Sequence, residues 1–565
     1  MAISPSKYTV LSLLLAVLLC TEACRKYETE PLYTIQDELV WDELDSLGTL
    51  AGWFLADIYT YLPNGFNRVA GDFLDAATDD ALPSLNNQPV QYFTNGRINV
   101  LNNPDPYWGS AYYGIRAANV FLKNIDKVPN NVLRTFGKAE ARFLRAMSYF
   151  ELVKRYGGVP LIGDTVFTLQ DNLQVPRNNF EQCVNYIVNE CDAIKDQLRK
   201  ETIADGDWGK AQRGAALALK SRVLLYAASP LMNGGGVESN PALRSLTGYP
   251  SYDASRWQKA LDAADSVIAL KYYALQASFN NVFTVKRNTE VIFAKQRGNT
   301  FDIETNNAPV GYGDPAISYG LTSPTQNLVD AFPMTNGQAI TSPTSGYNPQ
   351  APYTNRDPRL ALTVFCNGAT WLKRSVETFT GGKDKPGGTT VQTRTGYYLR
   401  KFMADMSNNT TYTNQSHNFI YFRYAEILLN KAEALNELGR TTEVYDQLVL
   451  LRKRAGITAG SNNLYGLTPG LDQTQMRSVI RNERRIELAF EEHRFWDIRR
   501  WKIAPDVLTG QVKGMRITKD AGTSALTFQV VDAAPVTFNA AKLYHLPIPY
   551  SEIVKNQALV QNEGW

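Results

Sequence analysis

The sequence is poor in the residues that most often carry catalysis or bind metals. Its 565 residues include only 3 His and 5 Cys. His417, His493 and His545 lie far apart, and neither an HExxH motif nor a Cys/His zinc spacing is present. A GxSxG nucleophile elbow, a P-loop and an EF-hand loop are also absent. The sequence therefore gives no positive indication of an enzyme or of a zinc protein.

The chain also has no large excess of positive or negative charge. The chain has 58 Lys and Arg against 55 Asp and Glu, which leaves a net charge of +3. A nearly neutral chain has no general attraction for nucleic acid or for an anionic membrane surface, so we expect no nucleic-acid partner. With 44% hydrophobic residues the chain can still form a large core.

Disulfide bonds are not expected. If Cys183 and Cys191 share a helix, they lie about 12 Å apart along its axis. A disulfide tolerates at most about 7 Å between Cα atoms. Together with Cys366, these residues are expected to be buried thiols.

The only strongly apolar run is near the N-terminus, in VLSLLLAVLLCTEAC. Lys7 precedes the run, which is shorter than the about 20 residues needed to cross a bilayer. Ala23 supplies a small residue before Cys24, as signal-peptide cleavage requires. We expect a lipoprotein signal peptide over residues 1–23 and a lipidated Cys24. No later stretch reaches a membrane-spanning length, so the rest of the chain is expected to be soluble apart from this anchor.

Other interpretations of this leader stay open. Cys20 is a second candidate for lipidation, but the bulky Leu19 precedes it. Thr21 and Glu22 make the residues before Cys24 an imperfect lipoprotein box, so cleavage without lipidation is an alternative. A buried core helix is the third interpretation, which the polar residues after Cys24 disfavour.

Helical periodicity governs much of the chain. Residues 138–156 place Phe143, Met147 and Phe150 on one face, with Gly157 as a stop signal. The expected surface of this helix carries Arg142, Arg145 and Lys154. Another helix is predicted at about 210–229, where Gly214, Ala218 and Ser221 form a small-residue face that allows close helix packing. Helix pairs are expected at about 107–156 and 180–229.

A helical hairpin of tetratricopeptide type is predicted over residues 421–456. The large and small positions of that repeat are occupied, although its tryptophan and terminal proline are missing. These positions are held by Leu428, Ala432, Leu435, Gly439, Val444 and Leu448.

Between residues 234 and 400 the helical pattern is lost. Runs such as MTNGQAITSPTSGYNPQAP favour loops and short strands. Because helical periodicity returns after Phe419, this segment is interpreted as an insertion on a helical scaffold. We therefore expect a helical region at 24–233, a loop-rich insertion at 234–400 and a second helical region at 401–565, together forming one compact unit.

The most highly charged stretch, RNERRIELAFEEHRFWDIRRW at 481–501, has two interpretations. Its acidic residues alternate with arginines at helical spacing, which neutralises the surface. An ion-paired helix that packs Ile486, Phe490 and Trp496 is favoured over a phosphate-binding groove. The carboxylate pairs Asp79–Asp80 and Glu491–Glu492 contain the groups that glycoside hydrolysis needs, but adjacent side chains usually point apart.

Aromatic residues are plentiful, with 30 Tyr, 24 Phe and 9 Trp, and many lie in polar loops. Flat rings that cover the C–H faces of a ligand, beside amide and guanidinium groups, suit sugar or peptide binding. The two richest stretches are DDALPSLNNQPVQYFTNGRINVLNNPDPYW and NNAPVGYGDPAISYG, and GATWLKR is a third. For each single ring, packing under its own loop is the alternative. The candidate ligand-binding residues are Tyr92, Asn95, Arg97, Tyr107, Tyr312, Asp314, Tyr319 and Trp371.

Seven motifs in order from residue 139 to the C-terminus, behind the lipobox-like cysteine, resemble the SusD/RagB-like family of outer-membrane nutrient-binding lipoproteins. They are AEARFLRAMSYFELVKRYGGVPLI, AALALKSRVLLYAASPL, PTQNLVDAFPMTNG, RDPRL, FRYAEILLNKAEALNELG, RNERRIELAFEEHRFWDIRRW and LPIPYSEIVKNQALVQNEGW. Two departures are visible, the imperfect box before Cys24 and Glu563 where the family's closing motif usually has proline.

The resemblance implies a mainly α-helical, SusD-like fold in which tetratricopeptide-like hairpins carry an irregular, loop-rich insertion with short strands. It implies tethering at the surface of the outer membrane, where such proteins lie over a TonB-dependent transporter and capture oligosaccharides without catalysis. The family motifs mark the scaffold, so no ligand-contacting residue is transferred from them.

Three alternatives remain at this stage. The ligand could be a peptide or another nutrient, the chain could be a surface glycoside hydrolase, or it could be a purely structural lid on the transporter. No cofactor is expected, although a structural calcium ion held by scattered loop oxygens would leave no linear motif.

Overall fold

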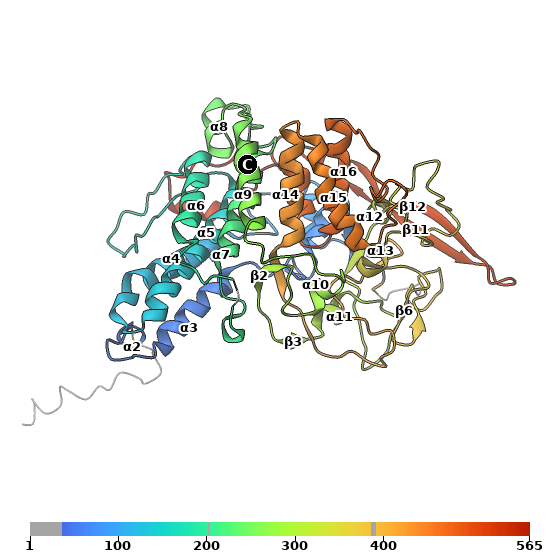
Figure 1. Ribbon diagram of the computed structural model, residues 1–565, viewed down its shortest axis with the longest axis horizontal. Coiled ribbons are helices and arrows are strands. Elements are labelled where there is room, and N and C mark those ends of the chain that lie inside the picture. The colour runs from blue at the N-terminus through green and yellow to red at the C-terminus, as the bar shows by residue number, and fades with distance from the viewer. Residues whose placement is uncertain (1–36, 202, 235, 386–390) are drawn as a thin grey trace, which may run out of the picture.

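The computed structural model describes residues 37–201, 203–234, 236–385 and 391–565. The predicted signal peptide and Cys24 lie outside these residues. Helices occupy one side and the centre of the molecule, and loops with short strands occupy the other side, from which the hairpin β11–β12 projects (Figure 1). The predicted mainly helical fold with a loop-rich insertion is confirmed.

The first helical region forms antiparallel neighbours along the chain. Helices α4 and α5 pack together, α5 packs against α6, and α6 packs against α7. This arrangement confirms the predicted pairs at 107–156 and 180–229. The helices up to this point are α2 (Asp37–Val40), α3 (Thr49–Ile58), α4 (Trp108–Asn124), α5 (Lys138–Tyr156), α6 (Phe180–Ile194) and α7 (Arg213–Ala228).

Helix α5 begins and ends where the sequence pattern places it. Its stop is Gly157, whose φ of 76° suits glycine and few other residues. The prediction that one side of α5 faces solvent is wrong, because nearly every residue of the helix is buried. Arg145 and Lys154 lie in the interior and bind Glu190 and Glu151. A helix enclosed by neighbours on both sides needs buried ion pairs for its charged residues.

The second helical region contains the predicted tetratricopeptide-type hairpin. Helices α14 (Tyr424–Glu437) and α15 (Thr441–Ala455) are joined at Gly439, which has φ of 77°. The apolar repeat positions of both helices are buried. The prediction is confirmed except at its start, where residues 421–423 belong to a strand. The later helices are α16 (Gln473–Glu487), α17 (Arg494–Arg500), α18 (Ala504–Val507) and α19 (Tyr550–Lys555).

Helix α9 (Ser255–Ile268) joins the two helical regions, although the sequence indicated loops there. It packs against both α7 and α14. The small-residue face of α7 serves close packing as predicted. A Cβ on Gly214 would overlap the ring of Tyr273, and Ser221 Oγ accepts a hydrogen bond from Asn430 of α14 at 3.2 Å. The remaining short helices of the middle segment are α8 (Pro241–Thr247), α10 (Asn281–Thr284), α11 (Asp302–Asn307), α12 (Gln326–Ala331) and α13 (Pro358–Thr363).

The strands form two-stranded antiparallel pairs within the described residues, not one continuous sheet. Three of the six pairs fasten a loop of the middle segment to a distant part of the chain. The long hairpin of β11 and β12 was not predicted, because the sequence analysis expected the C-terminal region to be helical. The pairs are β1 (Ala81–Pro83) with β4 (Thr322–Pro324), β2 (Val291–Lys295) with β10 (Phe419–Arg423), β3 (Asn299–Thr300) with β9 (Gln415–Ser416), β5 (Val364–Phe365) with β8 (Tyr398–Leu399), β6 (Thr370–Trp371) with β7 (Arg374–Ser375), and β11 (Gly510–Lys519) with β12 (Leu526–Val536).

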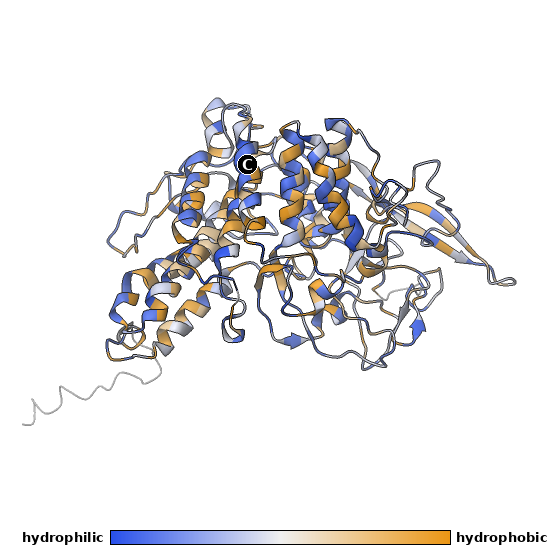
Figure 2. Cartoon of the chain, in the orientation of Figure 1, coloured by the Kyte–Doolittle hydropathy of each residue, from blue (hydrophilic) through white to orange (hydrophobic). Residues whose placement is uncertain are grey.

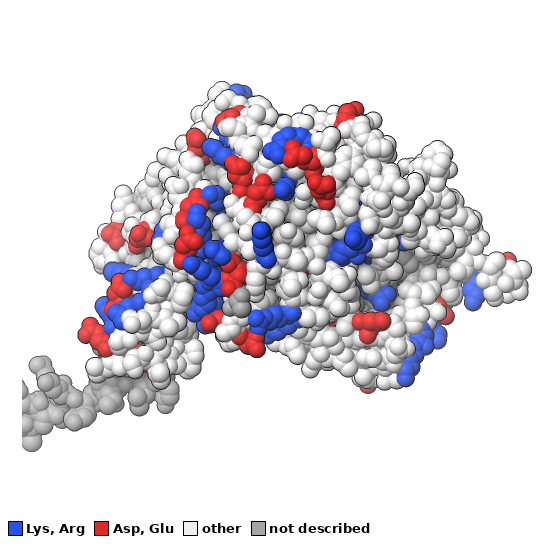
Figure 3. Space-filling model, viewed as in Figure 1, with Lys and Arg blue, Asp and Glu red and all other residues white. Residues whose placement is uncertain are grey.

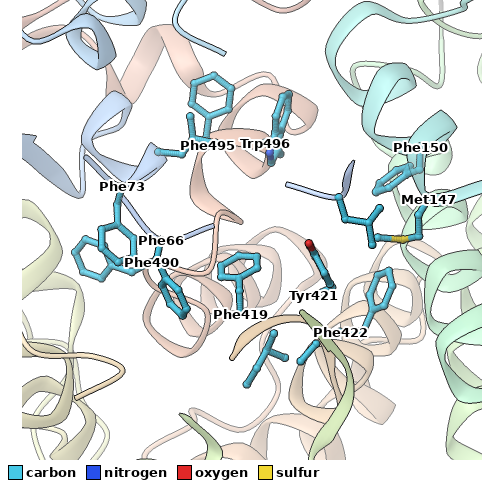
Figure 4. Close-up of a cluster of buried hydrophobic side chains, with 14 of the residues drawn as sticks. Phe66, Phe73, Met147, Phe150, Phe419, Tyr421, Phe422, Phe490, Phe495 and Trp496 are labelled. Carbon is cyan, nitrogen blue, oxygen red and sulfur yellow. The ribbon is translucent and has the colours of Figure 1, made fainter. Parts of the chain in front are cut away.

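A large apolar cluster joins the first helical region, the middle segment and the C-terminal strands, and a second one lies among α7, α9 and α14–α16. The helices carry alternating apolar and polar stretches (Figure 2). Phe66 lies edge-on to Phe402 and Phe419, with ring centroids 5.0 and 5.3 Å away. Phe73 meets Phe490 at 5.9 Å, and Figure 4 shows these rings gathered between segments from both ends of the chain. Edge-to-face contacts of this kind stabilise a core beyond the area they bury. Cys183, Cys191 and Cys366 are buried free thiols, as expected.

The charged stretch 481–501 is not one helix. Helix α16 ends at Glu487, and the chain turns through Phe490 and Glu492, both with positive φ, before α17 begins. Most of its charges are paired, as the sequence indicated, but most partners come from other elements and lie in the interior. Glu487, for example, contacts Arg359 and Arg423. Arg499 instead donates to the carbonyls of Leu543 and Phe495.

Arg423 is the centre of this buried ion network. Its guanidinium contacts the carboxylates of Glu290, Glu487 and Glu491, each at 2.7 Å, and all four side chains are almost fully buried. Glu487 also pairs with Arg359, which binds Glu483 and Asp357 at 2.8 Å. The network therefore connects the middle segment, the start of α14 and the end of α16.

Carboxylates on the N-terminal side meet the same C-terminal stretch. Arg485 and Arg494 both bind Asp79 at 2.8 Å. Burial opposes ionisation of Asp79, but the two guanidinium groups outweigh it and hold its pKa at about 2. Within the described residues, no arginine or lysine pairs with Asp75. Burial, followed by the negative charges of Asp80 and Glu492, raises the pKa of Asp75 to about 8.

Replacing Arg423 by Ala should lower the free energy of unfolding by about 3–5 kcal/mol, because three buried carboxylates lose their shared cation. Urea denaturation measures the change. The matched control is Arg440→Ala, which removes a solvent-exposed pair with Glu443 and should leave the urea midpoint unchanged. Equal shifts for the two variants would contradict a structural role for the buried network.

The raised pKa of Asp75 predicts a stability loss at higher pH. The folded state keeps this proton between about pH 4 and pH 8, whereas the unfolded chain releases it. The free energy of unfolding should therefore fall as the pH rises through this window, with a limiting slope of about 1.4 kcal/mol per pH unit from this group. Asp75→Asn should remove that slope, so the variant gains stability relative to the parent between pH 5 and pH 8.

Urea denaturation at several pH values tests the prediction for Asp75. Asp196→Asn, at an exposed position, is the control and should follow the parent. Parallel pH profiles for the parent and Asp75→Asn would show that this carboxyl is already ionised in the folded chain.

Candidate functional site

The pairing of β1 with β4 brings together the two aromatic-rich loops that the sequence analysis selected. Leu82 lies opposite Ser323, and the pairing continues through Ser84, whose N–H donates to the carbonyl of Leu321 at 2.7 Å. The hydroxyls of Ser84 and Ser323 lie 2.7 Å apart. Because the strands are antiparallel, the residues that follow β1 run beside those that precede β4. The residues just after β1 and those just before β4 thus lie beside each other.

Exposed apolar side chains gather around this junction. In the extended stretch before β4, Ala316, Ser318 and Gly320 face inward, whereas Ile317 and Tyr319 face solvent. Tyr319 is 52% exposed. We use the name loop ridge for the four large exposed side chains near β1 and β4, which are Leu85, Phe301, Ile317 and Tyr319.

The loop ridge is held in place from below. The backbone N–H of Tyr319 donates to the carbonyl of Thr305 in α11 at 2.8 Å. Tyr412 is buried; its ring lies 6.2 Å from the ring of Phe301, and its hydroxyl meets Ser318 Oγ at 2.5 Å. A rigid support lets exposed rings bind a ligand without first being ordered.

Tyr92, Asn95 and Arg97 form a small unit on the neighbouring loop. The guanidinium of Arg97 lies 5.1 Å from the ring centroid of Tyr92. Asn95 Oδ1 accepts the backbone N–H of Arg97 at 3.1 Å. Asn95 and Arg97 are exposed and Tyr92 is half-buried. The unit offers amide and guanidinium groups beside a ring, as the sequence indicated.

Tyr312 is held by its surroundings on one side. Its hydroxyl donates to the backbone carbonyl of Trp371 at 2.7 Å, and the guanidinium of Arg374 lies 3.7 Å from its ring centroid. Arg374 is fixed by two hydrogen bonds to Asp384, at 2.8 and 2.9 Å. Burial raises the pKa of Tyr312 well above its ordinary value, so the hydroxyl stays a donor. Asp314, two residues on, is exposed.

Two of the predicted site residues lie in the interior. Trp371 is 0% exposed, and its ring packs 5.0 Å from that of Phe365. Tyr107 is also buried; it donates from its hydroxyl to the carbonyl of Tyr61 at 2.7 Å and lies beneath the guanidinium of Arg155. Neither ring presents a face to a ligand, so both are removed from the candidate site. For these two, packing under the loop is the correct interpretation.

The structure adds residues that sequence reasoning missed. Phe301 and Leu85 join the ridge only through tertiary contacts, whereas the alternation in AISYG could have indicated Ile317. Arg394 also lies at the junction, where its side chain makes a 3.4 Å contact with the carbonyl of Pro83. Burial lowers the pKa of Arg394, and among the described residues no carboxylate pairs with it.

Charge is distributed unevenly over the molecule. In the view of Figure 3, acidic and basic side chains crowd over the helical half and are sparse over the loop-rich half. Asn86 and Asn87, which follow Leu85 of the loop ridge, are exposed, and Asn95 is exposed farther along the same loop. A surface of rings and amides suits a ligand with many hydroxyl or amide groups.

The paired carboxylates weighed for hydrolysis are engaged elsewhere. Asp79 and Asp80 bind Arg485, while Glu491 binds Arg423 and Glu492 binds Arg68. All four carboxylates are buried. Within the described residues there is no group of three or more His, Cys, Asp or Glu that could hold a metal ion. Across the same part of the chain, no helix has the length and apolar character needed to cross a membrane.

Comparison with known proteins agrees with this architecture. A family model described as the SusD family matches residues 289–565, and one described as starch-binding and associating with the outer membrane matches residues 60–225. SusD-like protein P2 of Formosa agariphila is 26% identical over 504 residues, which cover 87% of this chain and 86% of the relative.

Solved structures resemble the chain over almost its whole length. A SusD-like protein of Bacteroides fragilis is 27% identical, with a TM-score of 0.76 and coverage of 94% of this chain and 99% of that one. A SusD-like carbohydrate-binding protein of the same species is 24% identical, with a TM-score of 0.72 and coverage of 91% and 99%. A laminarin-binding SusD-like protein is 23% identical, with a TM-score of 0.64 and coverage of 92% and 99%. The last two likenesses concern the fold alone. Together the matches confirm the resemblance that the sequence motifs indicate.

Proposed function

The chain belongs to the SusD/RagB-like family, and from this premise we propose that it is a cell-surface lipoprotein that binds oligosaccharides and passes them to a TonB-dependent outer-membrane transporter. The loop ridge is the proposed binding surface. Tyr319 and Phe301 provide ring faces for the apolar C–H side of a sugar. Asn95, Arg97 and Arg394 provide donors and acceptors for its hydroxyls.

The observation that carries this proposal is the supported exposure of Tyr319 at the β1–β4 junction. Monomeric proteins seldom leave large apolar side chains grouped on a surface without an interaction to serve. Hydrogen bonds from the backbone of Tyr319 and between Ser318 and the buried Tyr412 keep the ridge in a fixed shape. Two relatives by fold are described as carbohydrate-binding and laminarin-binding, which favours a glycan over other nutrients.

Binding without catalysis fits the same surface. The carboxylate pairs that could serve a glycosidase are buried against arginines. Delivery to a transporter is proposed from family membership, and one family model carries an association with the outer membrane in its description. Lipidation of Cys24 is the proposed anchor, and a structural calcium ion is not required by the proposal.

Removing the rings of the loop ridge should weaken glycan binding. We expect Tyr319→Ala and Phe301→Ala each to lower affinity for a bound glycan about tenfold, because stacking on the sugar face is lost. Affinity electrophoresis against a panel of soluble glycans identifies the ligand, and calorimetry measures the change. Tyr550→Ala is the matched control, since Tyr550 is 53% exposed but lies on α19.

Three results would contradict the glycan proposal or its placement on the loop ridge. Failure of every panel glycan to bind, with binding of peptides instead, would favour the peptide-receptor alternative. Release of reducing ends by the purified chain would indicate a hydrolase. Unchanged binding in both ridge variants would move the site elsewhere on the molecule.

Replacing Cys24 by Ala should release the chain from membranes. A lipidated cysteine carrying more than one acyl chain gives stable attachment, and the variant has no thiol to acylate at this position. Fractionation of cells followed by immunoblotting measures the distribution. Cys20→Ala is the control and should remain in the membrane fraction; the reverse pattern would identify Cys20 as the lipidated residue.

A further inference from the structure

A cleft lies on the helical side of the molecule, apart from the loop ridge. It has a volume of about 360 Å³ and opens between α3, the loop before α7 and strand β2. None of its lining residues belongs to the loop ridge or to the Tyr92 unit. Its size falls within the range of small-molecule sites.

The walls of this cleft are mostly apolar. Leu55 and Ala56 of α3 form one side, Phe293 and Tyr421 contribute aromatic surface, and Leu133 lies nearby. Glu140, Arg199 and Lys210 also line the cleft, but they are held in ion pairs and leave few free partners for the hydroxyls of a sugar. The cleft therefore favours an apolar body.

The acidic group in the cleft is already satisfied. Glu140 is buried, accepts a hydrogen bond from Tyr59 Oη at 2.7 Å and pairs with Arg199. Arg199 also contacts Asp207 at 3.2 Å. Asp207 also pairs with Lys210 at 2.6 Å, so the two carboxylates and the two cations balance one another and leave no free anion to attract a cation.

Two other hydrogen-bond donors in the lining, in contrast, bind no described carboxylate. The Nε1 atom of Trp208 is buried and has no partner among the described residues. Lys295 Nζ donates to the carbonyls of Thr60 and Leu62, at 3.1 and 2.6 Å, and makes no ion pair with any described carboxylate. An ammonium has three donors, so one remains for a ligand. Both atoms favour a ligand with a hydrogen-bond acceptor. Because no described carboxylate neutralises the ammonium of Lys295, an anionic acceptor is favoured.

From these contacts we infer that the cleft binds an amphipathic organic anion, with a flat or aliphatic apolar body of about 12–20 non-hydrogen atoms and one carboxylate or sulfonate head. The body lies against Leu55, Ala56 and Phe293, and the head accepts hydrogen bonds from Trp208 Nε1 and Lys295 Nζ. This site is independent of the proposed glycan surface, and either can exist without the other.

Gly52 allows the cleft to be filled without disturbing the fold. It lies within α3 and lines the cleft, and a Cβ built on it meets nothing within 4 Å. Replacing a helical glycine also removes a source of backbone entropy in the unfolded chain. Gly52→Leu should therefore fold at least as stably as the parent while it occupies the cleft, and Gly52→Ala adds only one methyl group.

Calorimetric titration of the full chain with 2-naphthoate tests the inference. We expect one equivalent to bind, at least tenfold more tightly than 2-naphthylmethanol, which has the same apolar body without the charge. Gly52→Leu should weaken 2-naphthoate binding at least tenfold, and Gly52→Ala should change it less than threefold. Trp208→Phe keeps a ring but loses the donor, and should weaken binding about fivefold.

Each alternative outcome is decisive. Absence of saturable binding, or equal affinity in Gly52→Leu and Gly52→Ala, would overturn the site. Equal binding of 2-naphthoate and 2-naphthylmethanol would overturn the assignment of an anionic head. Tyr319→Ala should leave 2-naphthoate binding unchanged, so a failure of the glycan proposal and a failure of this one give different results.

Discussion

The buried pairing of arginines with carboxylates is the constraint on which the structure depends. Arg423 and Arg359 join the middle segment and the start of α14 to Glu487 at the end of α16. Arg485 and Arg494 join the same C-terminal stretch to Asp79 beside β1. A buried charge without its partner is costly, so these pairs leave few alternative arrangements for the segments they connect. These pairs therefore fix the relative positions of segments that lie more than 300 residues apart in the chain.

This constraint explains how an irregular half can present a defined surface. The loops on that half have few regular hydrogen bonds of their own, and pairs of two to five residues such as β1–β4 fasten them. The pair β1–β4 is positioned beside the carboxylates that Arg485 and Arg494 bind. A rigid helical scaffold therefore fixes the place of the ridge, while loop sequence decides its chemistry. The helical side carries a separate cleft whose lining has the opposite character: it is mostly apolar, with the unpartnered N–H of Trp208 and the ammonium of Lys295, which pairs with no described carboxylate.

Periodicity predicted the scaffold well because helices are encoded locally. The bounds of α5 and the hairpin of α14 and α15 follow from apolar spacing and from glycines at their ends. Prediction from periodicity failed where contacts with distant segments outweigh the local pattern. Helix α9 lies in a region read as loops, and the stretch 481–501 is broken at Phe490 and Glu492. Burial of Arg145 and Lys154 could not be foreseen, since a charged residue is normally expected at a surface.

The candidate site shows the same division. Composition and loop chemistry selected the two segments that meet at β1 and β4, and Tyr319 and Asn95 are exposed there. The same criteria also selected Trp371 and Tyr107, which are buried, and missed Phe301. The sequence by itself determined the helical repeats, the absence of metal and nucleophile motifs, and the segments rich in rings. Only the tertiary structure decided which rings face solvent, because exposure depends on contacts with residues far away in the chain, and no local pattern records those contacts.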